Sequence, residues 1–263
     1  MKRMKRITLI MVCFFVIILG TNAYAGLNLV VYNGGGPESA ITTAIWDLGL
    51  TIDSVTVRDD SVGNGVKLAD LATADALIVG WNYQGNMSGL DETILATGIK
   101  GNILITGHDA DWHVVNGKGI TGSPGDAVDD DATKFLKQAI LFATEQTGTG
   151  LVALADFTEG FDYLPDSWGI TAIAGLAGDE EVKITGAGDA SGVYDGLTND
   201  DMSPWVYSYH NVFDEFDPRF VVFENHHSVI EPITIGYVVP VPAALLLGLL
   251  GLSVAGVKLR KFA

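Results

Sequence analysis

Both ends of this chain are uncharged apolar segments bordered by basic residues, and this arrangement restricts the folded part to the middle. All 32 acidic residues lie between residues 26 and 238, together with only eight of the 15 basic ones. The middle therefore carries a net charge of −24, while the hydrophobic surplus of the 263-residue chain lies at its ends. Such an acidic body argues against nucleic-acid binding, because phosphate contacts need a basic face.

The first 25 residues have the pattern of an export signal. Four basic residues precede an uncharged apolar run over residues 7–20, and Ala23 and Ala25 supply the small residues that signal peptidase requires. We expect cleavage after Ala25; the alternative, an uncleaved anchor helix, would have a short span. The single cysteine, Cys13, lies in the segment expected to be removed, so neither a disulfide scaffold nor a cysteine metal site is expected.

The last 25 residues, 239–263, form a second apolar segment with motifs in a fixed order. A Val-Pro-Val-Pro-Ala string is followed by an uncharged stretch that ends at residue 257, and a basic cluster closes the chain. The uncharged stretch predicts a transmembrane helix, although it is short beside the roughly 20 residues of a permanent span. A basic end stays cytoplasmic, which would leave the acidic body outside the membrane. The motif residues are Val239, Pro240, Val241, Pro242, Ala243, Lys258, Arg260 and Lys261.

This tail resembles the PEP-CTERM protein-sorting signal of Gram-negative bacteria, in its VPLPA variant. Val241 stands where the name-giving Glu of that signal would be. The resemblance implies an exosortase as a partner, processing of the tail, and release to the cell surface or into an exopolysaccharide matrix. A plain C-terminal membrane anchor is the alternative interpretation.

The middle, residues 26–238, alternates strand-like and helix-like patterns. Runs of β-branched and apolar residues predict strands, and apolar residues at helical spacing predict helices between them. Such alternation predicts a parallel sheet covered by helices, here a three-layer α/β domain with a mostly parallel sheet. The predicted strands are 27–32, 51–57, 76–81, 102–106, 151–155, 182–184, 220–223 and 233–238, and the predicted helices are 38–48, 66–72, 88–99 with Ser88 as cap, and 129–145. The Gly-rich stretches 148–150 and 186–192 are predicted loops.

The element order and the strings at residues 76–81 and 102–113 resemble the flavodoxin-like fold of class I glutamine amidotransferases. Those enzymes place a cysteine nucleophile on the sharp turn after a central strand, with His and Glu later in the chain. Here the corresponding turn reads Gly107-His108-Asp109, without Cys or Ser, and no Gly-x-Ser-x-Gly occurs. We therefore expect no acyl-transfer nucleophile, and the late His210 is only a weak catalytic candidate beside His108 and Asp109.

The string from His108 to His113 is the strongest candidate in the sequence for a catalytic or metal-binding site. Two carboxylates and two imidazoles follow one strand, at the sheet edge where open α/β folds collect ligands. Asp109, Asp111 and His113 are candidate metal ligands, with Ca²⁺ or another divalent cation as the cofactor. In the alternative interpretation Asp109 caps the loop, while His108 and Trp112 pack on the sheet.

Several polar and aromatic residues are expected to share that edge. The turn after the first strand and the loop after the 76–81 strand should lie beside the His108 string, because parallel strands end together. The indole rings of Trp81 and Trp112 suit stacking on a sugar ring. The candidate binding residues are Asn33, Gly34, Gly35, Trp81, Asn82 and Trp112.

Two classes of function follow from these features. The first is a non-catalytic binding or structural role at the cell surface or in an exopolysaccharide matrix, where an acidic surface would also attract divalent cations. The second is an extracellular, metal-dependent hydrolase that acts on polysaccharide through the His108–His113 string. A permanently anchored envelope protein is a third reading.

Overall fold

The structure is a computed structural model, and it describes the acidic middle of the chain with internal gaps. The described residues are 26–33, 40–81, 87–116, 130–155, 161–174, 181–203, 211–226 and 231–240. Both predicted terminal helices and the predicted cleavage site fall outside these ranges. Within them, no helix combines the length and the apolar character that crossing a bilayer requires.

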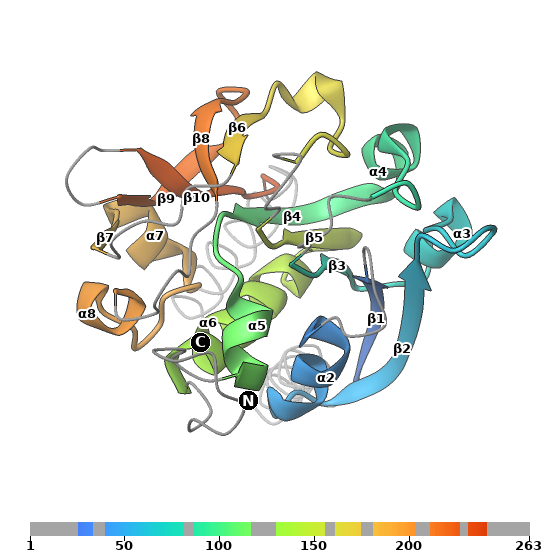
Figure 1. The fold of residues 1–263 in the computed structure, drawn as a ribbon, viewed down its shortest axis with the longest axis horizontal. Coiled ribbons are helices and arrows are strands. Elements are labelled where there is room, and N and C mark those ends of the chain that lie inside the picture. Colours follow the sequence, from blue (N-terminus) through green and yellow to red (C-terminus); the bar gives the residue numbers. More distant parts are fainter. Residues whose placement is uncertain are drawn as a thin grey trace, which may run out of the picture.

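An eight-stranded sheet runs through the domain (Figure 1). Its strand order is β2-β1-β3-β5-β4-β10-β9-β7. The four pairings from β2 to β4 are parallel, whereas β10, β9 and β7 join in antiparallel fashion. The bounds are β1 (Leu27–Asn33), β2 (Ile52–Asp59), β3 (Ala76–Val79), β4 (Ile99–Thr106), β5 (Thr149–Ala153), β7 (Val182–Ile184), β9 (Val221–His226) and β10 (Pro232–Tyr237). The predicted α/β class with a mostly parallel sheet is therefore confirmed.

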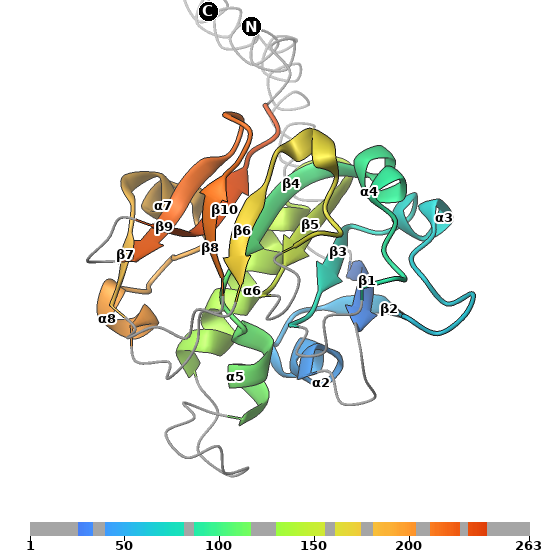
Figure 2. The same cartoon turned by 45° about the horizontal axis from the view of Figure 1, so that its top comes forward.

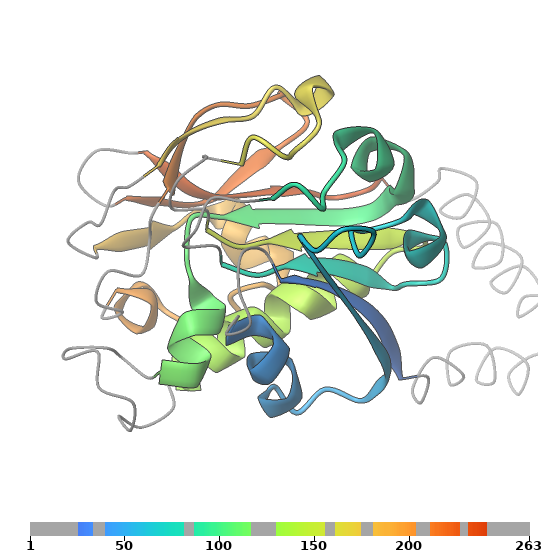
Figure 3. The ribbon, with the colours of Figure 1, turned by 45° about the vertical axis from the view of Figure 1, so that its right-hand side comes forward.

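Further elements cover both faces of this sheet, which makes three layers (Figures 2 and 3). One face carries α2 (Ala40–Asp47), α5 (Ala110–Asn116), α6 (Asp130–Thr144), α7 (Gly186–Ser191) and α8 (Asn199–Met202). The other carries α3 (Leu68–Leu71), α4 (Glu92–Gly98), the 3₁₀ turn η2 (Asp166–Trp168) and a small sheet of β6 (Thr171–Ala174) and β8 (Asn211–Glu215). The strands in the middle are buried on both sides; all four residues of β3 are buried.

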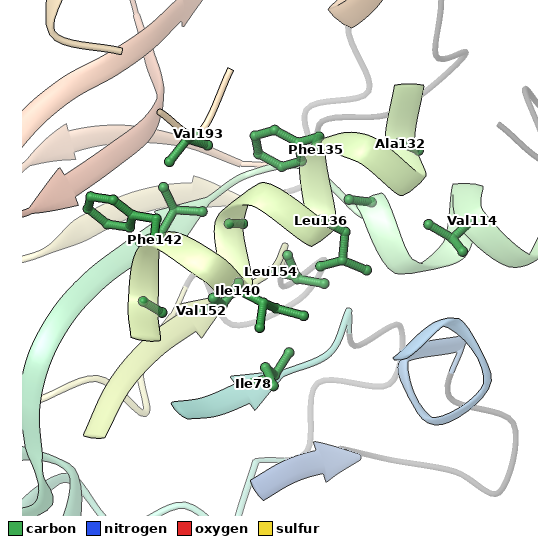
Figure 4. Packing of buried hydrophobic residues seen from close by; sticks show 14 of the residues in the cluster. Ile78, Val114, Ala132, Phe135, Leu136, Ile140, Phe142, Val152, Leu154 and Val193 are labelled. Carbon is green, nitrogen blue, oxygen red and sulfur yellow. The ribbon is translucent and has the colours of Figure 1, made fainter. Parts of the chain in front are cut away.

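Helix α6 forms the centre of the larger core (Figure 4). Phe135, Ala139, Ile140 and Phe142 form the apolar stripe that the helical spacing predicts, and all four are buried. Figure 4 shows Leu136 and Ile140 on the side of α6 that faces Ile78 of β3, whereas the Phe135 ring lies toward Val193. Asp130 and Asp131 open the helix, where negative charge interacts favourably with its dipole. This packing holds the ends of β3, β4 and β5 at fixed positions.

Three local predictions were wrong. Asp91, not Ser88, caps α4, because the Asp91 carboxylate accepts a hydrogen bond from the backbone N–H of Ile94 at 3.0 Å. The stretch at 148–150 is a loop only at Gly148, since β5 begins at Thr149 in the middle of the sheet. The stretch at 186–192 contains helix α7, which the Thr185 hydroxyl caps.

Replacement of the observed cap should weaken the domain, and replacement of the predicted cap should not. We expect Asp91→Ala to lower the free energy of unfolding by about 1 kcal/mol, because Ile94 N–H loses its acceptor. Ser88→Ala is the matched control and should change it by less than about 0.5 kcal/mol. Urea unfolding of both variants checks this, and a larger loss for Ser88→Ala would contradict the assigned cap.

Candidate functional site

The segment that follows β4 is the centre of the candidate site, and it is helical rather than a loop. Helix α5 begins at Ala110, so Asp111 and His113 lie on helical turns. The prediction of a loop for this string was therefore wrong. Gly107 makes the sharp exit from β4 possible, because a Cβ there would collide with the Asn211 carbonyl oxygen. The Gly107 N–H donates to the Ile233 carbonyl at 2.8 Å. His108, Asp109, Asp111 and His113 are all buried.

His108 belongs to a buried polar network that connects three neighbouring strands. Its Nε2–H donates to Glu224 Oε2 on β9 at 2.8 Å, and both side chains are 0% exposed. The hydroxyls of Tyr194 and Thr234 donate to the same oxygen at 3.2 and 2.9 Å. Thr106, at the end of β4, is hydrogen-bonded to Thr234 at 2.9 Å. The network supplies Glu224 Oε2 with three donors, whereas the buried Oε1 has none among the described residues.

Burial beside the Glu224 carboxylate raises the pKa of the Tyr194 hydroxyl well above its usual value. Tyr194 therefore stays a hydrogen-bond donor at any physiological pH. The ring of His108 also packs edge-on against Phe135, with 5.8 Å between the ring centres. These contacts give His108 a position inside the fold rather than on an open surface.

Asp109, Asp111 and His113 form a second group, on the first turns of α5. His113 Nε2 lies 3.2 Å from Asp109 Oδ1, and the ring of Trp112 packs edge-on against His113 at 5.0 Å. The Asp111 Oδ2 atom accepts the backbone N–H of Trp81 at 3.1 Å, which ties α5 to the end of β3. Burial raises the pKa of the Asp111 carboxyl to about 7, and the nearby charge of Asp109 adds to the shift. Asp111 is thus a buried acid that titrates near neutral pH.

The structure brings part of the predicted binding set to the same edge. Asn33 ends β1, Trp81 follows β3, and Trp112 lies on α5. Both tryptophans are half-buried. Gly34, Gly35 and Asn82 lie outside the described residues, as does the late His210. Within the described ranges, no three His, Cys, Asp or Glu side chains are arranged to share a metal ion.

Two residues of the predicted sorting motif, Val239 and Pro240, lie within the described part of the chain. Val239 donates its backbone N–H to Asn102 Oδ1 at 3.0 Å, and Pro240 is exposed. The rest of the motif, Val241, Pro242, Ala243, Lys258, Arg260 and Lys261, lies outside the described residues, and so do Ala23 and Ala25.

Sequence reasoning missed Glu224, the partner of His108, and it also missed Tyr194 and Thr234, which donate to the same carboxylate. Glu224 directly follows the apolar run that predicted its strand, so a charge at the end of a buried strand was the one available signal. Nothing in the spacing links it to His108, which lies 116 residues earlier. Only the strand order β4-β10-β9 brings the two together.

A separate hollow of about 510 Å³ lies on the opposite face of the sheet, between η2 and the end of β8. Carboxylates dominate its lining, which consists of Asp166, Ser167, Gly169, Asp214, Glu215, Phe216 and Asp217. It is open to solvent and lies apart from the His108 and Asp111 groups. We therefore base the candidate site on the strand ends and not on this hollow.

Comparison of the chain with protein-family models, with curated proteins and with solved structures finds no match in any of the three.

The His108–Glu224 pair should behave as a coupled unit in stability. His108→Leu removes a donor from a buried carboxylate, and we expect a loss of about 3–5 kcal/mol in the free energy of unfolding. The double variant His108→Leu/Glu224→Met should be more stable than the sum of the two single losses predicts, because it also removes the buried charge. Urea unfolding of the four proteins measures the coupling; strict additivity would contradict the pair.

The raised pKa of Asp111 predicts a pH-dependent stability. The folded state holds this proton up to pH about 7, whereas an unfolded aspartate releases it near 3.8, so the contribution of Asp111 is lost as pH rises between these values. Relative to the native chain, Asp111→Asn should gain stability from pH 4 to pH 8, by at most about 4 kcal/mol.

Urea unfolding at both pH values tests this, with Asp47→Asn, a change at an exposed carboxylate on α2, as control. An equal pH dependence of the native chain and Asp111→Asn would contradict the assignment.

Proposed function

We propose that this chain is an exported protein of the cell surface or exopolysaccharide matrix of a Gram-negative bacterium. In this proposal, signal peptidase removes residues 1–25, and an exosortase reads the PEP-CTERM-type tail at residues 239–263. The α/β body between them binds an extracellular polysaccharide and has no catalytic role.

The observation that carries this proposal is the position of the first and last strands relative to the two terminal signals. β1 begins at Leu27, two residues after the expected cleavage, and lies between β2 and β3. β10 ends at Tyr237, before Pro240, and lies between β4 and β9. Cleavage at either signal would leave every described strand in place. A chain processed at both ends would therefore keep its folded body.

The resemblance to flavodoxin-like and amidotransferase-like folds forms part of the proposal. Helices on both faces, the order β2-β1-β3 and the sharp turn after β4 support it. The flavodoxin order continues 4-5, whereas here β5 lies between β3 and β4, so the likeness is limited to the first three strands and the turn.

A binding role suits the chemistry at the strand ends. The turn where an amidotransferase would carry its nucleophile holds His108, whose imidazole is buried and hydrogen-bonded to Glu224. The half-buried indoles of Trp81 and Trp112 lie at the same edge, and such rings bind the apolar faces of sugars.

A hydrolase is the second candidate, and one observation favours it. The Asp109–His113 contact lies on the same helical turns as Asp111, whose pKa near 7 is typical of a general acid or base. This activity would be identified by the release of reducing ends from the polysaccharide of the producing bacterium. The release should be lost in the Asp111→Asn variant.

Mass spectrometry of the protein recovered from the cell surface or medium tests the proposal. We expect a chain that begins at Gly26 and lacks residues 258–263. The double variant Pro240→Ala/Pro242→Ala should keep the basic end, whereas Pro218→Ala, a change at an exposed proline in the turn before β9, should be processed normally. A surface form that retains the complete basic end would contradict sorting, and a full-length soluble form in the cytosol would contradict export.

A further inference from the structure

The carboxyl edge of the sheet contains a switch in chain direction between β1 and β3. After β1 the chain passes through α2 to β2, on one side of β1, whereas β3 lies on its other side and leads through α4 to β4. α2 and α4 cover opposite faces of the sheet. Strand ends that diverge in this way leave a crevice, which is where open α/β sheets bind ligands.

The register places Asn33 and Gly80 side by side at this switch. Tyr32 pairs with Val79, and the Gly80 N–H donates to the Tyr32 carbonyl at 3.2 Å, so the next residue of β1, Asn33, lies beside Gly80. Leu29 and Val31 belong to the core under α2 and α6, and side chains alternate along a strand. Asn33 therefore points to the face that carries α5.

Asp111 of α5 lies above the same glycine. A Cβ at Gly80 would be 3.0 Å from Asp111 Oδ2 and 2.5 Å from Ile41 Cγ2, so only glycine allows this approach. The Trp81 N–H fixes Asp111 Oδ2 at 3.1 Å. Asn33 and Asp111 thus come from two different elements and share Gly80 as a neighbour.

Both side chains present a buried acceptor oxygen that lacks a donor. Asn33 Oδ1 and Asp111 Oδ1 have no hydrogen-bond partner among the described residues. An unsatisfied buried acceptor costs free energy, so two neighbouring ones favour a ligand that brings O–H or N–H donors. An anionic ligand would place further acceptors against them.

The surroundings narrow the class of ligand further. Asp111 is fully buried, whereas Asn33, Trp81 and Trp112, at the same edge of the sheet, are half-buried and retain some exposure to solvent. With its pKa raised to about 7, the Asp111 carboxyl exists in two forms: Oδ1 accepts a hydrogen bond when the group is ionised and donates one when it is protonated, and a sugar hydroxyl can pair with either form. Donor hydroxyls next to apolar C–H faces, as in a neutral sugar, match both the oxygens and the rings.

We propose that Asn33 and Asp111 form the floor of a site for a neutral saccharide unit, whose hydroxyls donate to Asn33 Oδ1 and Asp111 Oδ1 between Trp81 and Trp112. This inference rests on the proposed polysaccharide-binding function, and adds to it the residues of the site and the neutral, donor-rich character of the ligand.

Calorimetric titration of the full-length chain, in a detergent without sugar groups, tests the site. The probes are cellohexaose and mannohexaose as neutral oligosaccharides and hexagalacturonate as an anionic one. We expect a neutral probe to bind, and Asn33→Leu and Asp111→Asn each to weaken it about tenfold, because each removes or replaces one acceptor. Trp112→Ala, which leaves the floor intact, should also weaken it.

Trp46→Ala is the matched control, since Trp46 is a tryptophan on α2 that is 62% exposed. The affinity of this variant should equal that of the native chain. Circular dichroism and melting of each variant separate lost binding from lost fold. Binding that Asn33→Leu and Asp111→Asn leave unchanged would overturn the assigned floor and leave the proposed function standing. Binding of hexagalacturonate alone would overturn the ligand class. If no probe binds the native chain, both this inference and the polysaccharide role fail, while export and sorting are judged separately by the mass of the surface form.

Discussion

The fold depends on one carboxylate that is buried where its two halves join. Glu224 accepts hydrogen bonds from His108 after β4, from Thr234 on β10 and from Tyr194 after α7. These donors come from the parallel half, the antiparallel half and the helical layer, so one charge fixes all three relative to one another. A buried, hydrogen-bonded carboxylate of this kind contributes little net stability compared with an apolar core, but removing one of its donors is costly. Its effect is to favour one arrangement of the halves over others of similar packing energy.

Much of the architecture was predictable because local pattern and global packing agree. The run Ala76–Val79 reads as a strand buried on both faces and lies near the centre of the sheet. The apolar stripe of Phe135, Ala139, Ile140 and Phe142, with the acidic residues that open the helix, predicts a helix over 129–145, and α6 spans Asp130–Thr144. The small elements were less visible: β6 and β8 have mixed composition, and α5 was hidden by a string of charged and aromatic residues that resembles a loop.

The candidate site was predictable in its location but not in its pairings. Strand ends that share an edge follow from the parallel order, which is why Asn33, Trp81 and the His108 string were expected together. The separation into a His108–Glu224 group and an Asp111–Trp81 group could not be predicted. It depends on the strand order β4-β10-β9 and on the start of α5 at Ala110. Side-chain partners that are more than 100 residues apart leave no trace in local spacing.

The position of β10 also determines when the domain can form. This last strand inserts between β4 and β9, with Thr234 opposite Thr106. Until residue 237 is free to pair, the β4 edge is an open row of hydrogen-bonding groups, the kind of edge that attracts other chains. Such long-range pairing is slow, since a large loop must close first. A polypeptide built in this way can complete its sheet only after its final strand is available for pairing with β4.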